Sequence, residues 1–413
     1  MTAVSASADV REAGGAPSGS GQASPGGASP TPTRGERGAG RIAELDGLRG
    51  MAILLVILGH YVGNAQHAPL GRVPHRLLQL FQVGWTGVDL FFVLSGFLIG
   101  GILLDAREAP HYFRAFYMRR VFRILPVYYA WTLVYGALVG GAVLFFPGRF
   151  GVGAADLVRV PVQLLFLQNF AIEMRPFAWM WFVVTWSLAV EEQFYLLAPP
   201  LIRFLSKRRL AIILGATIVV APLLRWGFFC YWAPGSQAAA YLMPCRADSL
   251  AWGVLLALGW RNKAFLEYLE EHRTMVQRIL IALALVFGGM LWWFLRPINL
   301  VSVTIGYTVL GMFYSCLVVV VLSQKEGWLA GVMRWKWLGA LGTISYCVYV
   351  IHLAINLLAH QVVFQGGPRI YNLEGVAVTL GALGLSLGVA SLSWKYFEKP
   401  LVRRGHGYSY DEG

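Results

Sequence analysis

The amino-acid sequence predicts an all-α integral membrane protein, a bundle of about ten transmembrane helices with both termini in the cytoplasm. Three observations lead to this fold class. Only 13% of the 413 residues are charged, whereas a soluble domain of this size carries about 25%. The mean hydropathy is +0.58. Apolar runs longer than the roughly 14 residues usual in soluble cores recur along almost the whole chain.

The chain divides into a polar head, a membrane domain and a short tail. Residues 1–40 are rich in Gly, Ala, Ser and Pro, so they cannot bury enough apolar surface to fold and are expected to be disordered. The membrane domain is expected over 41–400 and a cytoplasmic tail over 401–413. Segment 162–172 is too short to cross and is expected at the interface. The apolar segments predict spans at 50–64, 85–104, 124–146, 178–202, 210–232, 248–260, 278–295, 301–323, 338–360 and 374–394.

The basic residues indicate how the chain is threaded through the cell membrane. With the amino terminus inside, the inner loops hold 25 Lys and Arg residues and the outer loops hold 8, among them Arg246. This asymmetry is typical of a multi-pass membrane protein. The net charge of +13 therefore reflects loop topology and not nucleic-acid binding. The four cysteines form no CxxC pair or Cys/His cluster, so no metal site is predicted.

Two polar residues on the first span are the first candidates for chemistry. In LDGLRGMAILLVILGH, Arg49 and His60 are 11 positions apart, which is about 20° beyond three helical turns and places both on one face, roughly 16 Å apart. A histidine is the natural general base near neutral pH. A snorkelling arginine and an interfacial histidine would explain the spacing equally well.

Three carboxylates lie within predicted spans, where an unpaired charge is costly. Asp89 in VDLFFVLSGFLIG is near the outer end of the second span and can orient a histidine, although an interfacial carboxylate is equally ordinary. In WSLAVEEQFY, Glu191 and Glu192 point about 100° apart on a helix. One is expected to face the site and the other a structural partner such as an arginine. Trp186 and Tyr195, which bound this motif, are candidate residues of a substrate cavity.

A polar stripe marks the ninth span. In ISYCVYVIHLAIN, four polar residues are spaced 4, 3 and 4 apart, which puts them on one helix face directed into the bundle. They are Ser345, Tyr349, His352 and Asn356. They either line a substrate cavity or join two helices by hydrogen bonds, and we favour the cavity.

A basic cluster lies at the cytoplasmic mouth of the third span. RAFYMRRVFRILPVYY contains Arg119, Arg120 and Arg123. Topological positive charge explains part of this cluster, but residues one helical turn apart can also converge. Guanidinium groups match phosphate oxygens, and coenzyme A (CoA) carries a pyrophosphate and a 3′-phosphate. The cluster is therefore a candidate donor-binding site.

These motifs resemble those of the acyltransferase 3 family of bacterial membrane O-acyltransferases. The similarity runs from about Arg41 to Pro400, in the order LDGLRG with the Arg49–His60 pair, GVDLFFVLSGFLI, RRVFRILPVYY, WSLAVEEQFY, SYCVYVIH and KYFEKP. The resemblance implies essential roles for Arg49 and His60, and it links Arg120 and Arg123 to donor binding. It also implies acyl-CoA as the usual donor. The acceptor is usually a hydroxyl on a sugar, glycolipid, surface polysaccharide or glycosylated natural product.

Many members of the family carry a fused SGNH hydrolase-like domain. This chain stops soon after KYFEKP, so it resembles the single-domain members, which include macrolide acyltransferases and sugar acetylases. This similarity makes a surface-polymer acceptor a weaker expectation than a sugar or a glycosylated small molecule.

The working hypothesis is transfer of an acetyl or other short acyl group from acyl-CoA, as co-substrate with no resident cofactor, to a carbohydrate-type hydroxyl. The arginine cluster would hold the CoA headgroup, and the pantetheine arm would pass Arg49 towards His60, which acts as the base. A carboxylate, Asp89 or one of the two glutamates, would hold the imidazole. The rivals are a multi-span transporter, against which no internal repeat is visible, and a non-enzymatic scaffold.

Overall fold

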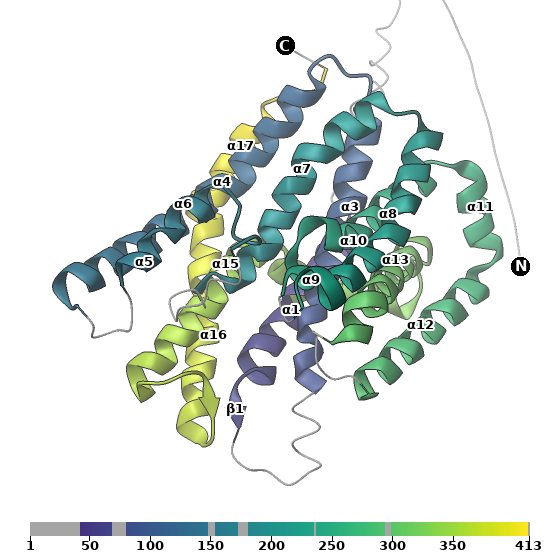
Figure 1. Ribbon diagram of the computed structural model, residues 1–413. Helices are drawn as coiled ribbons and strands as arrows, with labels where there is room; N and C mark the ends of the chain where they lie inside the picture. The colour runs from purple at the N-terminus through teal and green to yellow at the C-terminus, as the bar shows by residue number, and fades with distance from the viewer. Residues whose placement is uncertain are drawn as a thin grey trace, which may run out of the picture. The chain divides into compact units, whose positions relative to one another are not determined.

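The computed structural model describes residues 42–67, 80–147, 153–171, 181–234, 237–293 and 299–411. The predicted disorder over 1–40 lies outside these residues, as do the start of the predicted span 178–202 and the end of the span 278–295. The described chain is almost entirely helical (Figure 1). One short parallel pairing joins β1 (Gln66–His67) to β2 (Arg369–Ile370). The all-α membrane fold class is therefore confirmed.

The α-helices are α1 (Ala43–Leu58), α3 (Gly87–Asp105), α4 (Tyr112–Phe145), α5 (Ala154–Leu157), α6 (Arg159–Leu164), α7 (Trp186–Phe204), α8 (Lys207–Gly227), α9 (Ala238–Tyr241), α10 (Met243–Gly259), α11 (Lys263–Glu271), α12 (Arg273–Trp293), α13 (Tyr307–Ser323), α14 (Trp328–Met333), α15 (Lys336–Phe364), α16 (Leu373–Ser393) and α17 (Lys399–His406). Short π- or 3₁₀-helical segments adjoin them, namely η1 (Gly59–Gly63), η2 (Phe81–Thr86), η4 (Val183–Thr185), η5 (Phe228–Trp232), η6 (Ser302–Gly306) and η7 (Trp394–Glu398).

Within the described part, eight helical segments are long and apolar enough to cross a membrane. They are Ala43–Gly63, Phe81–Asp105, Tyr112–Phe145, Lys207–Trp232, Arg273–Met290, Ser302–Ser323, Lys336–Phe364 and Leu373–His406. The predicted spans 178–202 and 248–260 fall on α7, which carries two glutamates and an arginine, and on α10, which has 17 residues. The total of ten spans and the cytoplasmic side of the bundle stay predictions.

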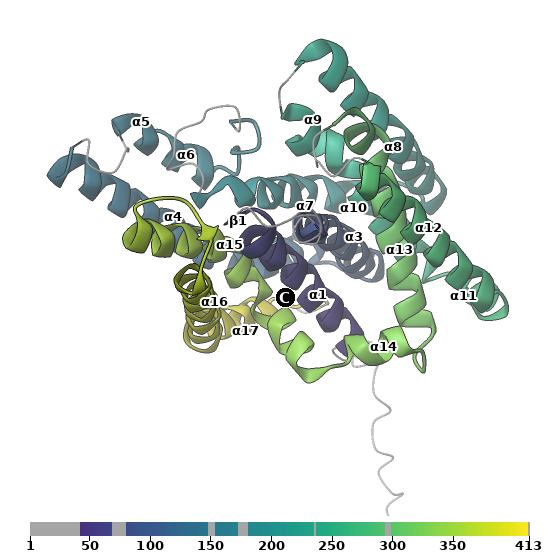
Figure 2. The ribbon, with the colours of Figure 1, turned by 90° about the horizontal axis from the view of Figure 1, so that it is seen from below.

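The helices are arranged around a central group. In two perpendicular views, α1, α3 and α7 lie between α4 and α16 on one side and α8, α12 and α13 on the other (Figures 1 and 2). Helix α1 packs against α3 and α15, and α3 packs against α10. The largest apolar cluster joins residues of α1, α3, α4, α7 and α15. Most faces of the central helices therefore contact other helices and not lipid. Polar side chains can be buried on those faces.

Small residues let α1 and α15 touch through their backbones. A Cβ atom added at Gly342 would collide with the carbonyl oxygen of Asp46, and one added at Gly50 would collide with that of Leu338. Membrane helices associate through such close packing, because lipid supplies no hydrophobic drive between them. The approach brings His352, in the polar stripe of α15, against His60 in η1, which continues α1.

The Gly342→Val variant is expected to push α1 and α15 apart. Overpacking costs about 1–3 kcal/mol, so we expect a lower melting temperature and less monodisperse protein on size-exclusion chromatography in detergent. Gly339→Val is the matched control, because a Cβ atom at Gly339, on the same helix, meets nothing within 4 Å. Equal stability of the two variants would contradict the close contact.

Candidate active site

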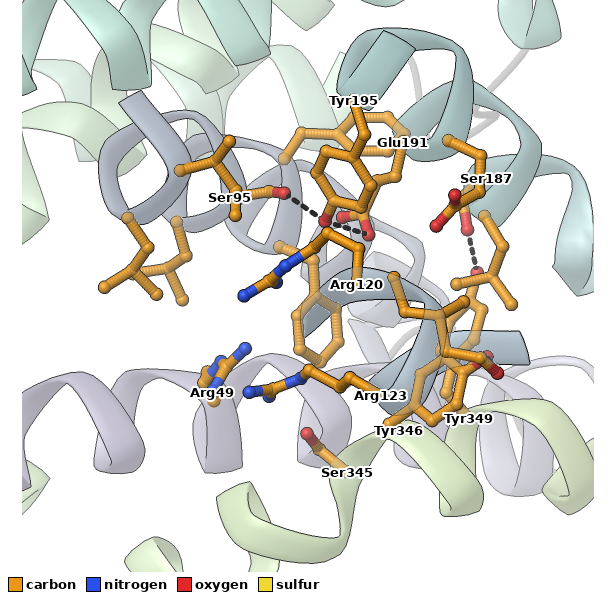
Figure 3. Close-up of a pocket in the computed structure, with 18 of the residues that line it drawn as sticks. Arg49, Ser95, Arg120, Arg123, Ser187, Glu191, Tyr195, Ser345, Tyr346 and Tyr349 are labelled. Atoms are coloured by element: carbon orange, nitrogen blue, oxygen red, sulfur yellow. Dashed lines mark hydrogen bonds between the residues drawn. The ribbon is translucent and has the colours of Figure 1, made fainter. Parts of the chain in front are cut away.

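The first cavity, here called the arginine cavity, has a volume of about 230 Å³. Arg49 from α1 and Arg120 and Arg123 from α4 enter it, and their guanidinium groups point towards one another (Figure 3). Much of the remaining wall is apolar and comes from α3. Its α3 side chains are Val88, Phe91, Phe92, Leu94, Ser95, Leu98, Ile99 and Ile102. The cavity therefore combines a concentrated positive charge with a long apolar side.

The positions of the arginines around α4 determine which of them converge. This helix begins at Tyr112, well before the predicted start of the span at 124, so the whole cluster is helical. Arg120 and Arg123 are three positions apart and share a face. Arg119 points elsewhere: its Nε donates to the Tyr408 carbonyl oxygen (3.0 Å) and its guanidinium lies 4.6 Å from the Tyr410 ring centre.

Arg119 therefore does not line the arginine cavity, contrary to the prediction that it converges with Arg120 and Arg123. Adjacent residues on a helix point about 100° apart, and this rotation turns Arg119 towards the carboxyl-terminal tail while Arg120 faces the cavity. Arg49 takes its place as the third cavity arginine, contributed by a different helix.

The arginine cavity also holds both glutamates of α7. Glu191 accepts a hydrogen bond from the Tyr195 hydroxyl (3.2 Å), which also pairs with Ser95 Oγ (2.8 Å). Glu192 lines the same cavity. Among the residues that the structure describes, no ion pair joins either glutamate to an arginine of the cavity. The three guanidinium groups thus keep their capacity to bind an anion.

The second cavity, here called the His60 cavity, has a volume of about 270 Å³. Its wall differs in kind from that of the arginine cavity, since aromatic and amide side chains predominate. It is lined by Gly59, His60, Asn64, Gln82, Trp85, Val88, Val183, Val184, Trp186, Tyr241, Arg246, Tyr307 and Tyr349. Arg49 and His60 therefore face different cavities although they are on the same continuous helical segment.

Val88 and Tyr349 line both cavities and form the wall between them. The Tyr349 hydroxyl lies 2.7 Å from the Val184 carbonyl oxygen and 2.6 Å from Ser187 Oγ. These two contacts hold the ring in the wall.

His60 lies in η1, a π-helical turn that continues α1, and such turns are frequent at functional sites. Its Nδ1 is 3.0 Å from the Val56 carbonyl oxygen and 3.1 Å from His352 Nε2. His352 Nδ1 in turn lies 2.8 Å from the Tyr349 carbonyl oxygen. Two histidines on facing helices are therefore joined in one hydrogen-bonded chain.

The carbonyl groups assign the tautomers of both rings. A carbonyl oxygen only accepts, so His352 Nδ1 carries the proton and its Nε2 has a lone pair. His60 Nδ1 faces two acceptors, Val56 and His352 Nε2, and therefore carries a proton as well. The lone pair of His60 is then on Nε2, the nitrogen that a general base needs to keep free.

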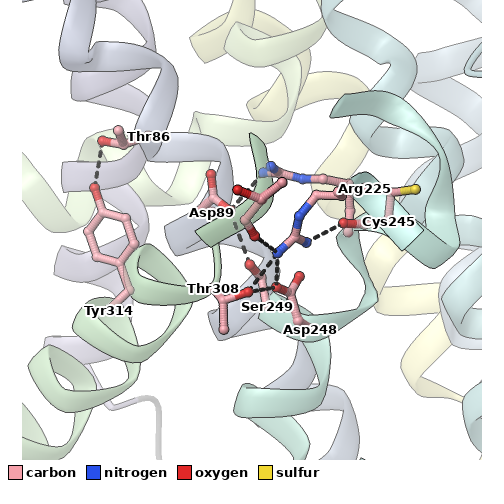
Figure 4. Close-up of polar contacts among 10 residues, drawn as sticks. Thr86, Asp89, Arg225, Cys245, Asp248, Ser249, Thr308 and Tyr314 are labelled. Carbon is pink, nitrogen blue, oxygen red and sulfur yellow. Dashed lines mark hydrogen bonds and ion pairs between the residues drawn. The ribbon is translucent and has the colours of Figure 1, made fainter. Parts of the chain in front are cut away.

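Asp89 does not hold His60, which corrects the predicted carboxylate–histidine pair. Its Oδ1 accepts from Arg246 Nη2 (2.7 Å) and from Ser249 Oγ (3.0 Å) (Figure 4). Asp89 is fully buried, and a buried carboxylate needs a cation near it. Arg246 on α10 supplies that charge, and His352 occupies the position expected for the carboxylate.

Three more of the predicted residues line one of the two cavities. Trp186 lines the His60 cavity, whereas Tyr195 and Ser345 line the arginine cavity. All four residues of the polar stripe on α15 are buried, as its direction into the bundle requires. Asn356 lines neither cavity, and its amide has no hydrogen-bond partner among the described residues.

The most important residue that sequence reasoning missed is Arg246. The sequence predicts an outer-loop charge at this position, but α10 begins at Met243, and Arg246 is only 2% exposed. A signal existed in the sequence, because Arg225, Arg246 and Asp248 interrupt an apolar region. Arg225 is likewise buried and pairs with Asp248 Oδ2 at 2.9 Å (Figure 4). The aromatic residues Trp85, Tyr241 and Tyr307 carried no such signal, since aromatic residues are common throughout this chain.

Comparison with known proteins identifies the family of this chain. Residues 42–394 match the family described as an acyltransferase domain. The chain is 25% identical over 408 residues to "Putative peptidoglycan O-acetyltransferase YrhL" of Bacillus subtilis, covering 88% of this chain and 55% of that protein. It is also 25% identical over 394 residues to "Peptidoglycan O-acetyltransferase OatA" of Listeria monocytogenes, covering 88% of this chain and 56% of that protein.

The chain thus spans about half the length of these curated relatives. No solved structure matches it. The family match covers the first span, both cavities and the polar stripe of α15. This multi-pass membrane protein therefore belongs to the acyltransferase 3 family.

Proposed function

We propose that this protein transfers an acetyl or other short acyl group from acyl-CoA to a hydroxyl of a carbohydrate or glycosylated molecule. The observation that carries the proposal is the pair of adjoining cavities. One presents three arginines that form no ion pair with a carboxylate in the described structure, and the next holds a histidine with a free lone pair. Family membership and the names of the relatives support the reaction type and a carbohydrate-containing acceptor.

The arginine cavity suits the donor. Arg120 and Arg123 can form bidentate hydrogen bonds with the phosphates of CoA, and Arg49 lies beyond them on α1. The apolar wall of α3 offers a surface for the pantetheine arm, whose few polar groups are widely spaced. In this arrangement the thioester lies at Val88 and Tyr349, the residues that line both cavities, where the arginine cavity adjoins the His60 cavity.

The chemistry then needs a single base. His60 Nε2 removes the proton of the acceptor hydroxyl as its oxygen attacks the thioester carbonyl carbon. The C–S bond breaks, the ester C–O bond remains, and the CoA thiolate takes the proton from the imidazolium. His352 accepts a hydrogen bond from His60 Nδ1–H throughout. It holds the reactive tautomer and stabilises the imidazolium charge, which makes it a positioning residue.

The test of this proposal is release of free CoA thiol by purified protein in detergent, with acetyl-CoA and longer acyl-CoAs, with and without sugar acceptors. We expect thiol release to be highest with a short acyl chain and an acceptor, and mass spectrometry to find an O-acylated sugar. No thiol release and no acyl-CoA binding at any chain length would overturn the proposal and favour a transporter.

His352→Leu should lower kcat while the KM for acyl-CoA stays unchanged. A hydrogen bond to a charged group contributes about 1.5–3 kcal/mol, so loss of the bond to the His60 imidazolium corresponds to roughly 10- to 100-fold in rate. His352→Gln keeps an acceptor oxygen on a similar length of side chain and is expected to recover part of the rate. A purely structural role for His352 would instead give equal defects in both variants, together with a lower melting temperature.

A further inference from the structure

We infer that the His60 cavity is an acceptor subsite for one neutral sugar ring, stacked on Trp186 and Tyr241 and hydrogen-bonded by Arg246. This inference rests on the proposed function, because it places the acceptor hydroxyl beside the base. It names the ligand class, the residues that bind it and the number of rings that enter, none of which follows from the acyl transfer alone.

The aromatic residues form rigid walls. Trp186 and Tyr241 meet edge to face with ring centres 4.6 Å apart, and Trp85 and Tyr307 do so at 5.4 Å. Such pairs are stable arrangements that preorganise the cavity. The C–H faces of a pyranose pack well against exposed aromatic faces, whereas an aliphatic chain needs neither aromatic rings nor the amides beside them.

The polar groups are placed among these rings. Asn64 and Gln82 line the cavity, and each amide offers both a donor and an acceptor. Sugar hydroxyls both donate and accept, so amides are suitable partners for them. Pockets for drug-sized ligands run from about 300 to 1,000 Å³. A cavity of about 270 Å³ therefore fits one ring better than several.

Arg246 supplies the strongest sign of an absent ligand. Its Nη2 is held by Asp89, and its guanidinium lies 3.8 Å from the Tyr307 ring centre. Its Nε and Nη1 are buried and have no hydrogen-bond partner in the part of the chain that the structure describes. Buried N–H groups of an arginine need acceptors, and leaving them without any is costly.

The charge of Arg246 is already balanced by Asp89 at 2.7 Å. An anionic ligand would therefore gain less here than in the arginine cavity, where neither Glu191 nor Glu192 forms an ion pair with the three arginines among the described residues. A neutral acceptor oxygen, such as a sugar hydroxyl or an acetamido carbonyl, fits the N–H groups on Nε and Nη1, which have no partner among the described residues. The two cavities thus select for different substrates: an anionic nucleotide on one side of Tyr349 and a neutral sugar on the other.

The experiment separates sugar binding from acyl transfer. Methyl β-N-acetylglucosaminide, methyl β-glucoside, methyl β-glucuronide and n-decanol are added to purified protein, first without donor in a thermal-shift assay and then with saturating acetyl-CoA. We expect the two neutral sugars to raise the melting temperature and to become acetylated. The glucuronide is expected to do so more weakly, and decanol not at all.

The variants locate the binding. Trp186→Leu should raise the KM for the neutral sugars about 2- to 10-fold and change the KM for acetyl-CoA less, because Trp186 does not line the arginine cavity. Trp186→Phe keeps an aromatic face and should keep most of the affinity. This variant keeps the test valid if the leucine variant misfolds. Trp328→Leu is the control, because Trp328 is 75% exposed on α14 and lines neither cavity.

The outcomes are distinguishable. Acetyl-CoA turnover with no sugar binding, or acetylation of decanol in place of the sugars, would overturn the sugar subsite and leave the acyltransferase proposal standing. An equal rise of the KM for acetyl-CoA and of the KM for the sugars in Trp186→Leu would overturn the separation of the two sites. Sugar binding that depends on Trp186, without any donor turnover, would support the subsite and overturn the acyl transfer.

Discussion

His60→Ala is expected to lower kcat for acyl transfer about 10²- to 10⁴-fold, the usual contribution of a general base. The expectation follows from the tautomer that Val56 and His352 impose, because it leaves Nε2 of His60 as the proton acceptor. No other ring nitrogen in the described part of the His60 cavity can replace it. Thiol release from acetyl-CoA in the presence of a sugar acceptor measures the effect.

The control for this variant is His272→Ala. His272 is a surface residue whose Nδ1 contacts the Tyr268 carbonyl oxygen, and it lines neither cavity. Its replacement should leave the rate unchanged. Binding of acyl-CoA by the His60→Ala variant should also be retained, because the arginine cavity is intact. Near-normal turnover by a folded His60→Ala protein would contradict the assignment of the base.

Arg120→Ala and Arg123→Ala are each expected to raise the KM for acetyl-CoA roughly 10- to 100-fold. A hydrogen bond to a charged group contributes about 1.5–3 kcal/mol, and both guanidinium groups enter the arginine cavity. Lysine at either position should recover only part of the affinity, because an ammonium group cannot make the bidentate contact. Titration of the initial rate against acetyl-CoA measures the change.

Arg119→Ala is the matched control for the donor site, since Arg119 is a neighbour on α4 with the same charge. It binds the Tyr408 carbonyl oxygen and faces the carboxyl-terminal tail. Its loss should leave the KM for acetyl-CoA unchanged and lower the melting temperature slightly. If Arg119→Ala raised the KM as much as Arg120→Ala does, a general effect of positive charge would replace the specific site.

Much of the local structure could be predicted from the sequence. Hydropathy located the membrane helices, and the 11-residue spacing of Arg49 and His60 was enough to place them on one helix, well apart along it. The 4-3-4 spacing on α15 predicted a buried polar stripe, and all four of its residues are buried. These properties depend on a single α-helix, whose period of 3.6 residues per turn can be recognised in the sequence alone.

Partners across helices could not be predicted in this way. Whether His60 meets Asp89 or His352 depends on which helix packs closest, and the contacts of Gly50 and Gly342 bring α15 to that position. Asp89 is occupied by Arg246 because α10 packs against α3.

The sequence by itself determined the membrane helices, the buried polar faces and the family. Only the tertiary structure decided that Arg119 lies outside the arginine cavity, that His352 contacts His60, and that two cavities adjoin at Tyr349. The physical reason is that helix periodicity is local, whereas hydrogen-bond partners are chosen by the close packing of helices far apart in the chain.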